Sequence, residues 1–335
     1  MKKLIGELLA PSVLKTKIPL SEKAKAFTEN SRQELKDIIS GKSNKKILII
    51  GPCSADFEES LYEYADFLSK LQEKVEDKIK IVLRFYTGKP RTIGGWKGLQ
   101  NSAPGETPDL ISGIENSRKI AVNIIEKYNL PLADELLHPQ LVEHIGDLYS
   151  YFAIGARSSE NQFHREVSSG LDFPVGMKNP TSGNISIMLN SVQAGTTPSV
   201  YVIGNDVYET SGNSYCHSIL RGGITGPNYD LESIKKAYEE NKKRNIINKG
   251  LIIDTNHDNS QKKYEKQIDI MQEVMNSISE NKELKNFVKG FMVESYLFDG
   301  RQDYSENIQK GLSLTDLCIG KERTEELIMK MYNLI

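Results

Sequence analysis

Two groups of side chains in this sequence have the types that chemistry on small anions requires. One group combines a thiol, an imidazole and two carboxylates: Cys53, His257, Glu294 and Asp316. The other is a set of cations: Arg84, Lys89, Arg91, Arg157, Lys178 and Arg221. Most of these residues stand at or just past the end of a short apolar run, as in KILIIGPCS. Because they are far apart in sequence, they can act together only if the fold gathers the ends of those runs.

The first group has the composition of a divalent metal site. Thiolate, imidazole and carboxylate ligands together suit manganese, iron, cobalt or zinc better than calcium or magnesium. A catalytic metal also keeps one coordination position open for water or substrate. We therefore expect one divalent ion, with Mn²⁺ first and Fe²⁺, Co²⁺ or Zn²⁺ as alternatives. Among the other histidines, His138 is the one rival to His257, because it also follows an apolar run.

The second group has the composition of an anion site. A single arginine at a strand end is usually a surface ion pair, so only the joint occurrence of six cations is informative. Cations gathered at one place repel one another unless phosphate or carboxylate groups neutralise them. Arginine binds such groups through its bidentate fork. A metal beside a double anion site suggests carbon–carbon or phosphoryl chemistry on phosphorylated sugars.

Short apolar runs alternate with longer helical patterns along the chain, which predicts βαβ units and a parallel sheet. The helical patterns include FEESLYEYADFLSKLQEKV, QLVEHIGDLYS, NISIMLNSVQAG, YDLESIKKAYEENKKRN and YEKQIDIMQEVMNSI. Nine strand candidates are present, one more than a barrel of eight strands needs. We interpret YVIGNDVYE as an inserted β-hairpin. The run that follows it, CHSILRGG, is then the sixth barrel strand. We therefore predict a (β/α)₈ TIM barrel, whose active site forms at the C-terminal ends of the strands. A doubly wound sheet would be favoured by a G-x-G-x-x-G turn after the first strand, and none is there.

Residues 1–45 lie outside this alternation, and residues 46–335 form the predicted catalytic barrel. The segment SEKAKAFTENSRQELKDIISGK predicts a helix with Gly41 as its C-cap. An apolar stretch before it should pack on its own barrel or on a partner's: Leu8, Leu9, Val13, Leu14, Ile18 and Leu20. A simple cap over the barrel and a regulatory role are both open for this extension.

Composition excludes several classes of protein. The formal net charge of −2 argues against a general nucleic-acid binder. No apolar run approaches the roughly 18 residues of a membrane span, and the N-terminal stretch does not resemble a signal peptide. The three cysteines, Cys53, Cys216 and Cys318, argue against a disulfide scaffold. We expect a soluble, cytoplasmic protein with reduced thiols and no contact with membrane or nucleic acid.

The motifs GPCS, KPRTIGGWKG, GARSSENQFHRE, ILRGG, DTNH, MVES and LTDLCIG resemble those of the microbial type I family of 3-deoxy-D-arabino-heptulosonate 7-phosphate (DAHP) synthases. The resemblance runs from ELLAPSVL to LTDLCIG, nearly the whole chain, and KPRT is its most specific piece. It implies an enzyme that condenses phosphoenolpyruvate with erythrose 4-phosphate and water and releases phosphate. That reaction is the first step of the shikimate pathway to chorismate and the aromatic amino acids.

The resemblance also implies roles for single residues. Cys53, His257, Glu294 and Asp316 match the family's metal ligands. The residues that match its phosphoenolpyruvate site are Arg84, Lys89, Arg157, Lys178 and Arg221. Those that match its erythrose 4-phosphate segment are Lys89, Pro90, Arg91 and Thr92. Lys89 is the candidate general acid, with purely electrostatic binding as the alternative, and Glu135 is expected to orient a water or a lysine. The family further implies a homo-oligomer, dimer or tetramer, with subunit contacts and an effector site in the extension.

The sequence departs from the family in QNSAPGETPDL, KNPTSGN and DTNHDN, so no inhibitory amino acid is assigned. Two other functions stay open: a phosphoenolpyruvate-dependent synthase that uses a five-carbon aldose phosphate, and a non-catalytic barrel that senses metabolites. Cys318 stands two residues after Asp316. We therefore expect it to approach Cys53 and to form a disulfide with it when metal-free protein meets air.

Overall fold

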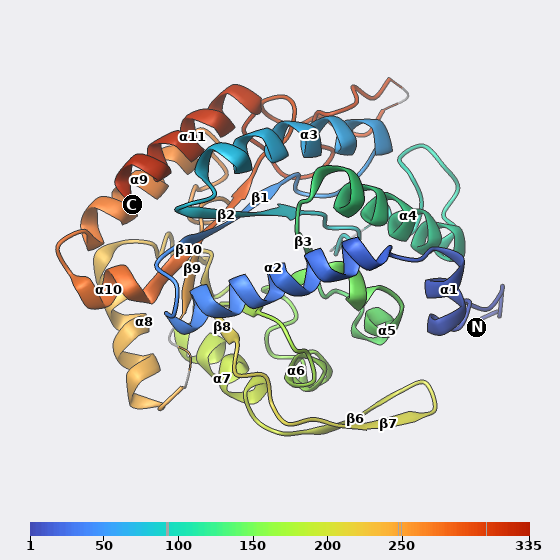
Figure 1. Cartoon of the computed structure of the whole chain (residues 1–335), viewed down its shortest axis with the longest axis horizontal. Coiled ribbons are helices and arrows are strands. Elements are labelled where there is room, and N and C mark those ends of the chain that lie inside the picture. The colour runs from blue at the N-terminus through green and yellow to red at the C-terminus, as the bar shows by residue number, and fades with distance from the viewer. Residues whose placement is uncertain (92–93, 247, 249, 306) are drawn as a thin grey trace.

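A closed barrel of parallel strands forms the body of the molecule (Figure 1). The computed structural model describes residues 1–91, 94–246, 248, 250–305 and 307–335. In that part of the chain, eight strands close in the order β1-β10-β9-β8-β5-β4-β3-β2. Their bounds are β1 Lys46–Gly51, β2 Ile79–Arg84, β3 Leu132–Glu135, β4 Tyr149–Ile154, β5 Val175–Lys178, β8 Cys216–Leu220, β9 Leu251–Asp254 and β10 Val288–Glu294. The predicted (β/α)₈ barrel is therefore confirmed.

Helices cover the outside of this barrel and connect its strands. Several begin at a side chain that accepts a hydrogen bond from the first turn, namely Asp109, Asn161, Asn184 and Asp230. The bounds are α3 Glu58–Val75, α4 Leu110–Tyr128, α5 Val142–Ile145, α6 Gln162–Ser169, α7 Ile185–Gly195, α8 Leu231–Lys243, α9 Lys266–Ile278, α10 Lys282–Phe287 and α11 Lys321–Leu334.

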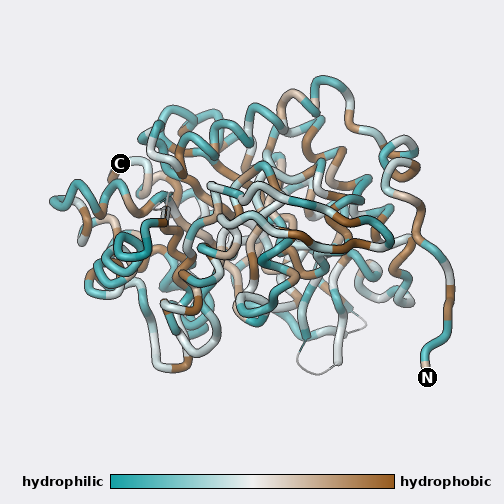
Figure 2. Tube along the Cα trace, turned by 90° about the horizontal axis from the view of Figure 1, so that it is seen from below, coloured by the Kyte–Doolittle hydropathy of each residue, from teal (hydrophilic) through white to brown (hydrophobic). Residues whose placement is uncertain are grey.

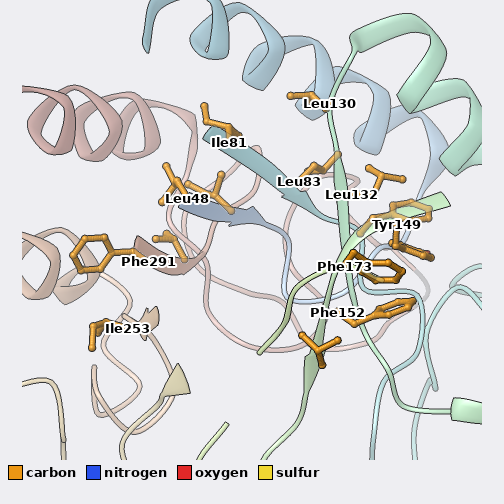
Figure 3. Close-up of a cluster of buried hydrophobic side chains, with 14 of the residues drawn as sticks. Leu48, Ile81, Leu83, Leu130, Leu132, Tyr149, Phe152, Phe173, Ile253 and Phe291 are labelled. Atoms are coloured by element: carbon orange, nitrogen blue, oxygen red, sulfur yellow. The ribbon is translucent and has the colours of Figure 1, made fainter. Parts of the chain in front are cut away.

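Alternate residues of each strand face two separate layers of the core. The outward layer packs against the helices and includes Leu48, Ile81, Leu83 and Phe291 (Figure 3). The inward layer fills the barrel and includes Ile47, Ile49, Val82, Ile252 and Met292. Hydropathy follows the same division, since the surrounding helices are largely hydrophilic while apolar residues gather toward the middle (Figure 2). The strands are therefore buried on both faces, as their continuous apolar runs predict.

The candidate YVIGNDVYE forms a β-hairpin outside the barrel, as predicted. Strand β6 (Val200–Ile203) pairs antiparallel with β7 (Asp206–Glu209), and β8 follows as the sixth barrel strand. On this hairpin Val200, Val202 and Val207 are exposed. The hairpin lies along the lower edge of the molecule in Figure 1.

The segment QLVEHIGDLYS is not the single helix that its pattern predicts. One turn of α-helix, α5, is flanked by the 3₁₀ turns Pro139–Leu141 and Gly146–Leu148, and Tyr149 already belongs to β4. Pro139 and Gly146 are poor residues for a helix interior. Tyr149 already pairs with Leu132 of β3, so the chain has entered the sheet at this point.

The predicted N-terminal helix closes the bottom of the barrel. Helix α2 (Glu22–Ser40) begins at the N-cap Ser21 and ends at Gly41, whose φ of 81° is left-handed. Its buried residues Leu35, Ile38 and Ile39 pack with the inward layer of the barrel. Arg32 reinforces this contact, since it donates to the carbonyl of Tyr149 at 2.9 Å, where β4 begins. The helix is therefore part of the barrel's own packing.

The residues before α2 are less covered. The short helix α1 (Pro11–Lys17) buries Leu14, and Leu20 is buried after it. Leu8, Leu9 and Ile18 are half-buried, whereas Leu4, Ile5 and Val13 are exposed. The N-terminal end itself extends away from the body (Figure 2). Among the described residues, no helix combines the length and the apolar character that crossing a membrane requires.

Candidate active site

Three of the four predicted metal ligands meet where the strands end. The three are Cys53, Glu294 and Asp316. Each offers one ligand atom, and these three atoms all lie within 4.8 Å of one another. Cys53 follows β1, Glu294 ends β10, and the two strands pair at Gly51 and Glu294. Asp316 comes from the loop after β10, and its Oδ2 accepts from the Cys53 thiol at 3.2 Å. The fold therefore gathers the soft and hard ligands that the sequence placed far apart.

His257 stands at the edge of this cluster. Its Nε2 lies 3.8 Å from Oε1 of Glu294, and its Nδ1 lies 2.9 Å from Oδ2 of Asp254. The contact with Asp254 is close but lacks the alignment of a linear hydrogen bond. His257 has a φ of 50°, which is uncommon for a residue other than glycine. Such backbone strain concentrates at functional sites, where the surroundings enforce it.

The donor set fits a divalent metal ion. Burial, and then the carboxylate of Glu294, raise the pKa of the Cys53 thiol well above its usual range. A thiol and two carboxylates crowded together need a cation before the thiol can ionise. A metal ion that prefers mixed sulfur, nitrogen and oxygen ligands supplies that charge. The four residues that would hold it are Cys53, His257, Glu294 and Asp316.

Lys89 joins the metal cluster to the substrate side. Its Nζ lies 2.5 Å from Sγ of Cys53 and 3.5 Å from Oδ2 of Asp316. Burial alone would lower the pKa of Lys89, but Cys53 and Asp316 outweigh it and raise this pKa. The ammonium group is therefore held in its charged form beside the cluster.

A cavity of about 630 Å³ opens above these residues. Most of the predicted site residues line it: Lys89, Pro90, Arg91, Glu135, Arg157, Lys178, Arg221, His257 and Asp316. They come from the ends of seven different strands or the loops that follow them, so the convergence depends on the barrel. Thr92, also predicted, lies outside the described residues. Arg91 is exposed and donates from Nε to the carbonyl of Trp96 at 2.8 Å.

Arg84 lies below the cavity and is not among the residues that line it. It is fully buried, donates to Oε1 of Glu294 at 3.0 Å, and stacks over the ring of Tyr86. One guanidinium nitrogen, Nη1, has no partner among the described residues. Arg84 thus supports the ligand Glu294 from beneath, while this unpaired nitrogen leaves one donor available.

Lys178 and Arg221 already have carboxylate partners. Nζ of Lys178 lies 2.8 Å from Oδ2 of Asp254, the same oxygen that faces His257. Arg221 pairs with Asp258, which also lines the cavity. The sequence analysis gave no role to Asp254 or Asp258. The polar run DTNHDN, which begins at the last residue of β9, was the available signal, because so many polar residues in one stretch rarely serve packing alone.

Other residues at the cavity were also missed. Asn256 donates to Oε2 of Glu294 at 2.5 Å, so it orients a predicted ligand. Lys262 and Arg301 add two cations to the lining. Arg301 comes from the loop after β10, where no motif singles it out.

The remaining histidines lie outside the cluster. His144 is in α5, where its Nε2 lies 3.1 Å from the carbonyl of Leu9. The other three have no role in the cluster either. His217 is fully buried, and its Nε2 lies 2.8 Å from the hydroxyl of Tyr151. His164 belongs to α6, where its Nδ1 lies 2.9 Å from Oδ1 of Asn161. His138 is half-buried and does not line the cavity. The structure therefore brings His257, and none of these four, to the ligands.

A (β/α)₈ barrel with a metal-competent cluster beside a cation-lined cavity defines an enzyme of the barrel class that acts on anionic substrates. Comparison with known proteins places the chain within that class. Residues 17–329 match the model of the DAHP synthetase I family. The chain belongs to this family.

Characterised relatives agree with this assignment. A phospho-2-dehydro-3-deoxyheptonate aldolase of Haemophilus influenzae is 38% identical over 98% of this chain and 91% of its own length. The Phe-sensitive enzyme of that name from Escherichia coli (strain K12) is 37% identical over 99% of this chain and 95% of its own. The solved structure of the aldolase from Francisella tularensis SCHU S4 superposes with a TM-score of 0.95 at 32% identity, covering 100% of this chain and 98% of that one.

Proposed function

We propose that this protein is a DAHP synthase, which condenses phosphoenolpyruvate with erythrose 4-phosphate and water to give DAHP and phosphate. Family membership supports the reaction. The observation that carries it in the structure is the cation-lined cavity that opens onto the thiol–carboxylate cluster. A substrate pair with two phosphates and a carboxylate provides the negative charge that such a cavity requires.

The cations divide between two substrates in this proposal. Phosphoenolpyruvate is bound by Lys89, Arg157, Lys178 and Arg221, with Arg84 offering its unpaired nitrogen from below. Erythrose 4-phosphate is bound by Lys89, Pro90, Arg91 and Thr92. Lys178 and Arg221 exchange part of their pairing with Asp254 and Asp258 for the substrate phosphate. Binding is thereby an exchange of anions on cations that are already oriented.

Cys53, His257, Glu294 and Asp316 hold one divalent metal, for which Mn²⁺ is the first candidate and Fe²⁺, Co²⁺ and Zn²⁺ are the alternatives. When bound, such an ion supplies Lewis acidity that polarises the aldehyde oxygen of erythrose 4-phosphate. Asn256 and Arg84 both donate to Glu294 and so fix the orientation of that ligand.

The chain's own residues complete the reaction. The third carbon of phosphoenolpyruvate attacks the aldehyde, and Lys89 is the residue that donates a proton from Nζ to the oxygen that becomes a hydroxyl. Water, which Glu135 at the cavity wall orients, then adds to the second carbon and releases a proton, and this proton makes up for the one that Lys89 donated. Phosphate leaves from the resulting hemiketal, and the charge on the departing group is stabilised by Arg157, Lys178 and Arg221.

The deciding experiment measures phosphate release from phosphoenolpyruvate in the presence of erythrose 4-phosphate, with metal supplied. We expect release only when both substrates are present, together with a stoichiometric amount of DAHP. Arabinose 5-phosphate in place of erythrose 4-phosphate is the matched control, and it should be inactive. Preference for the five-carbon sugar would instead identify a different sugar-acid synthase. Tight binding of both substrates without turnover would identify a metabolite sensor.

We also propose a homo-oligomeric, cytoplasmic enzyme. Free thiols at all three cysteines suit a reducing compartment. The exposed Leu4 and Ile5 at the N-terminal end and the exposed valines of the β6–β7 hairpin support contacts between subunits. Relatives differ in their inhibitor, since one is Phe-sensitive and another Tyr-sensitive at nearly the same identity, so no inhibitory amino acid is assigned to this chain.

A further inference from the structure

A second cavity lies at the opposite end of the barrel from the active site. It has a volume of about 610 Å³ and is formed by the segment between α2 and β1, by α10 and by the start of β10. Figure 1 shows that segment passing beside α10. The charged side chains of its lining are Lys45, Lys46, Lys282, Lys285, Lys289 and Glu283, and Ile335, which carries the terminal carboxylate, also lines it. Five lysines therefore share one hollow with a single acidic side chain and the terminal residue.

Two of these lysines are buried. Lys46 and Lys289 are only 5% and 4% exposed, and they stand side by side where β1 and β10 pair. Nζ of Lys46 donates to the carbonyls of Lys285 and Val288 at 2.6 and 2.5 Å. Nζ of Lys289 donates to Oδ1 of Asn286 at 3.0 Å. All three acceptors are neutral. The two ammonium groups therefore have hydrogen-bond partners, but these partners bring no negative charge to balance their positive charge.

Carboxylates do little to correct this imbalance. Lys45 pairs with Glu34 at 2.8 Å. Within the described residues, no carboxylate lies within 4.0 Å of the ammonium groups of the other four lysines. Glu283 is exposed and interacts with the hydroxyl of Tyr238 instead. Buried charges in proteins are normally paired, so an unpaired cluster of cations calls for an explanation.

The cost of burying these positive charges appears in the pKa values of two of the lysines. Burial lowers the pKa of Lys46 to about 7, and repulsion from Lys289 and Lys285 adds to the shift. Burial lowers the pKa of Lys289 to about 8. A bound anion would relieve both effects, because it would supply the missing negative charge to a site that is otherwise assembled.

We propose that this cavity is a binding site for a small phosphorylated anion. Nζ of Lys46 also caps the last carbonyls of α10, which gives that lysine a structural role. Capping does not explain why Lys282 and Lys285 converge on the same hollow. The site is separate from the active site, because Lys46 stands at the start of β1 whereas Cys53 follows its end. The cavity is large enough for a phosphate ester or pyrophosphate, and the proposal does not depend on the catalytic activity.

Pyridoxal 5′-phosphate is a suitable probe, because it carries a phosphate and an aldehyde that reports its position. The aldehyde condenses with a neutral lysine amine and releases water, and borohydride reduces the imine to a stable secondary amine. Peptide mapping of the intact protein, treated near neutral pH, then shows which lysines were labelled. We expect Lys285 and Lys289 to be labelled about tenfold more by this probe than by pyridoxal, which lacks the phosphate. Pyrophosphate should protect both.

A paired variant tests the source of that selectivity. Lys282→Gln with Lys285→Gln removes two charges from the rim, and we expect it to abolish protection of Lys289 by pyrophosphate. Lys23→Gln with Lys25→Gln removes the same charge from the exposed side of α2 and should leave protection intact. Labelling at Lys89 or Lys178 maps to the active site and should be equal in both variants.

Several outcomes would overturn the proposal. Equal labelling of Lys289 by pyridoxal and by its phosphate would show that the cavity has no preference for an anion. Absence of protection by pyrophosphate in the unmodified protein would contradict it as well. Should the paired variant fail to fold, the comparison of the two probes on the unmodified protein still decides the question.

Discussion

Oδ2 of Asp254 lies 2.9 Å from Nδ1 of His257, inside the barrel mouth. Asp254 is fully buried, and the same oxygen lies 2.8 Å from Nζ of Lys178. Because this carboxylate faces Nδ1, the other ring nitrogen, Nε2, is the one that faces Glu294. One oxygen atom therefore orients both a predicted metal ligand and a predicted substrate ligand.

Replacing Asp254 tests this double role. In Asp254→Asn the charge is removed while the shape is kept, and we expect the affinity for Mn²⁺ to fall by roughly 10–100-fold. The KM for phosphoenolpyruvate should rise as well, because the charge of Asp254 no longer holds the ammonium group of Lys178 in position. Calorimetric titration with Mn²⁺ measures the first effect without any turnover. Asp258→Asn is the control, since Asp258 pairs with Arg221 and should leave Mn²⁺ affinity unchanged.

Cys53 tests the metal site directly. A hydroxyl is a poor ligand where a thiolate stood, so Cys53→Ser should lose most activity and bind metal more weakly. In the unmodified protein a chelator should abolish activity, and added Mn²⁺ should restore it. Metal content by mass spectrometry and activity after dialysis provide the two measurements. Full activity in excess chelator would remove the metal from the proposal.

The division of the cations gives a third prediction. Arg91→Ala should raise the KM for erythrose 4-phosphate more than that for phosphoenolpyruvate, and Arg157→Ala and Lys178→Ala should do the reverse. Losing one charge-assisted contact should cost on the order of 1.5–3 kcal/mol in kcat/KM. Steady-state kinetics with each substrate varied in turn separates the two sites. Equal effects of all three variants on both substrates would show that the division is wrong.

Oxidation gives a fourth prediction. Cys53 and Cys318 are both fully buried, and the backbone of Cys53 hydrogen-bonds to the sulfur of Cys318. We expect metal-free protein kept in air to lose the activity that added Mn²⁺ would restore, as oxygen takes two electrons and two protons from these thiols to form a disulfide. Bound metal should protect, because it occupies the Cys53 sulfur. Mass mapping of oxidised protein checks the pairing, and an unmodified Cys53 after inactivation would rule it out.

The N-terminal extension gives a fifth prediction, and the structure decides where to cut. Removing residues 1–10 takes away the exposed Leu4 and Ile5 and leaves α2 in place. We expect this truncation to keep the stability of the barrel but to weaken assembly and any inhibition by an aromatic amino acid. Light scattering and inhibition curves measure both. An unchanged oligomer with unchanged inhibition would leave these residues without either role.

A truncation of residues 1–40 answers a different question. It removes Leu35, Ile38 and Ile39, each at most 1% exposed, and uncovers the bottom of the barrel. Each such side chain contributes on the order of 2–5 kcal/mol. We therefore expect the longer truncation to fail to fold, as circular dichroism would report, and to be uninformative about assembly.

The barrel was predictable because its strands are buried on both faces and so read as continuous apolar runs. The position of Cys53 was predictable for the same reason, since it follows such a run directly. Arg84 shows the limit of that reasoning. Its place at a strand end is evident from the sequence, but its position beneath the cavity depends on the register that sets it against Glu294.

Residues whose partners come from other loops were not predictable. The pairing of Asp258 with Arg221 depends on how the loop after β9 turns toward the end of β8. The lysine-lined cavity at the end of the barrel opposite the active site could not be predicted either, for a related reason. Lys46 and Lys289 are far apart in sequence, and each alone looks like an ordinary solvated residue. Only the closure of β1 on β10 makes them neighbours.

The packing of α2 against the barrel has a consequence for how the chain is made. This helix leaves the ribosome early, yet it lies against Gly250 and Lys289, which are synthesised near the end. The first strand likewise closes the sheet only when β10 arrives. The apolar face of α2 is therefore fully covered only late in translation, although part of it can pack on β1, β2 and β4 earlier, and contacts of such long sequence separation form slowly. Nascent chains arrested before β10 should consequently bind chaperones through this helix.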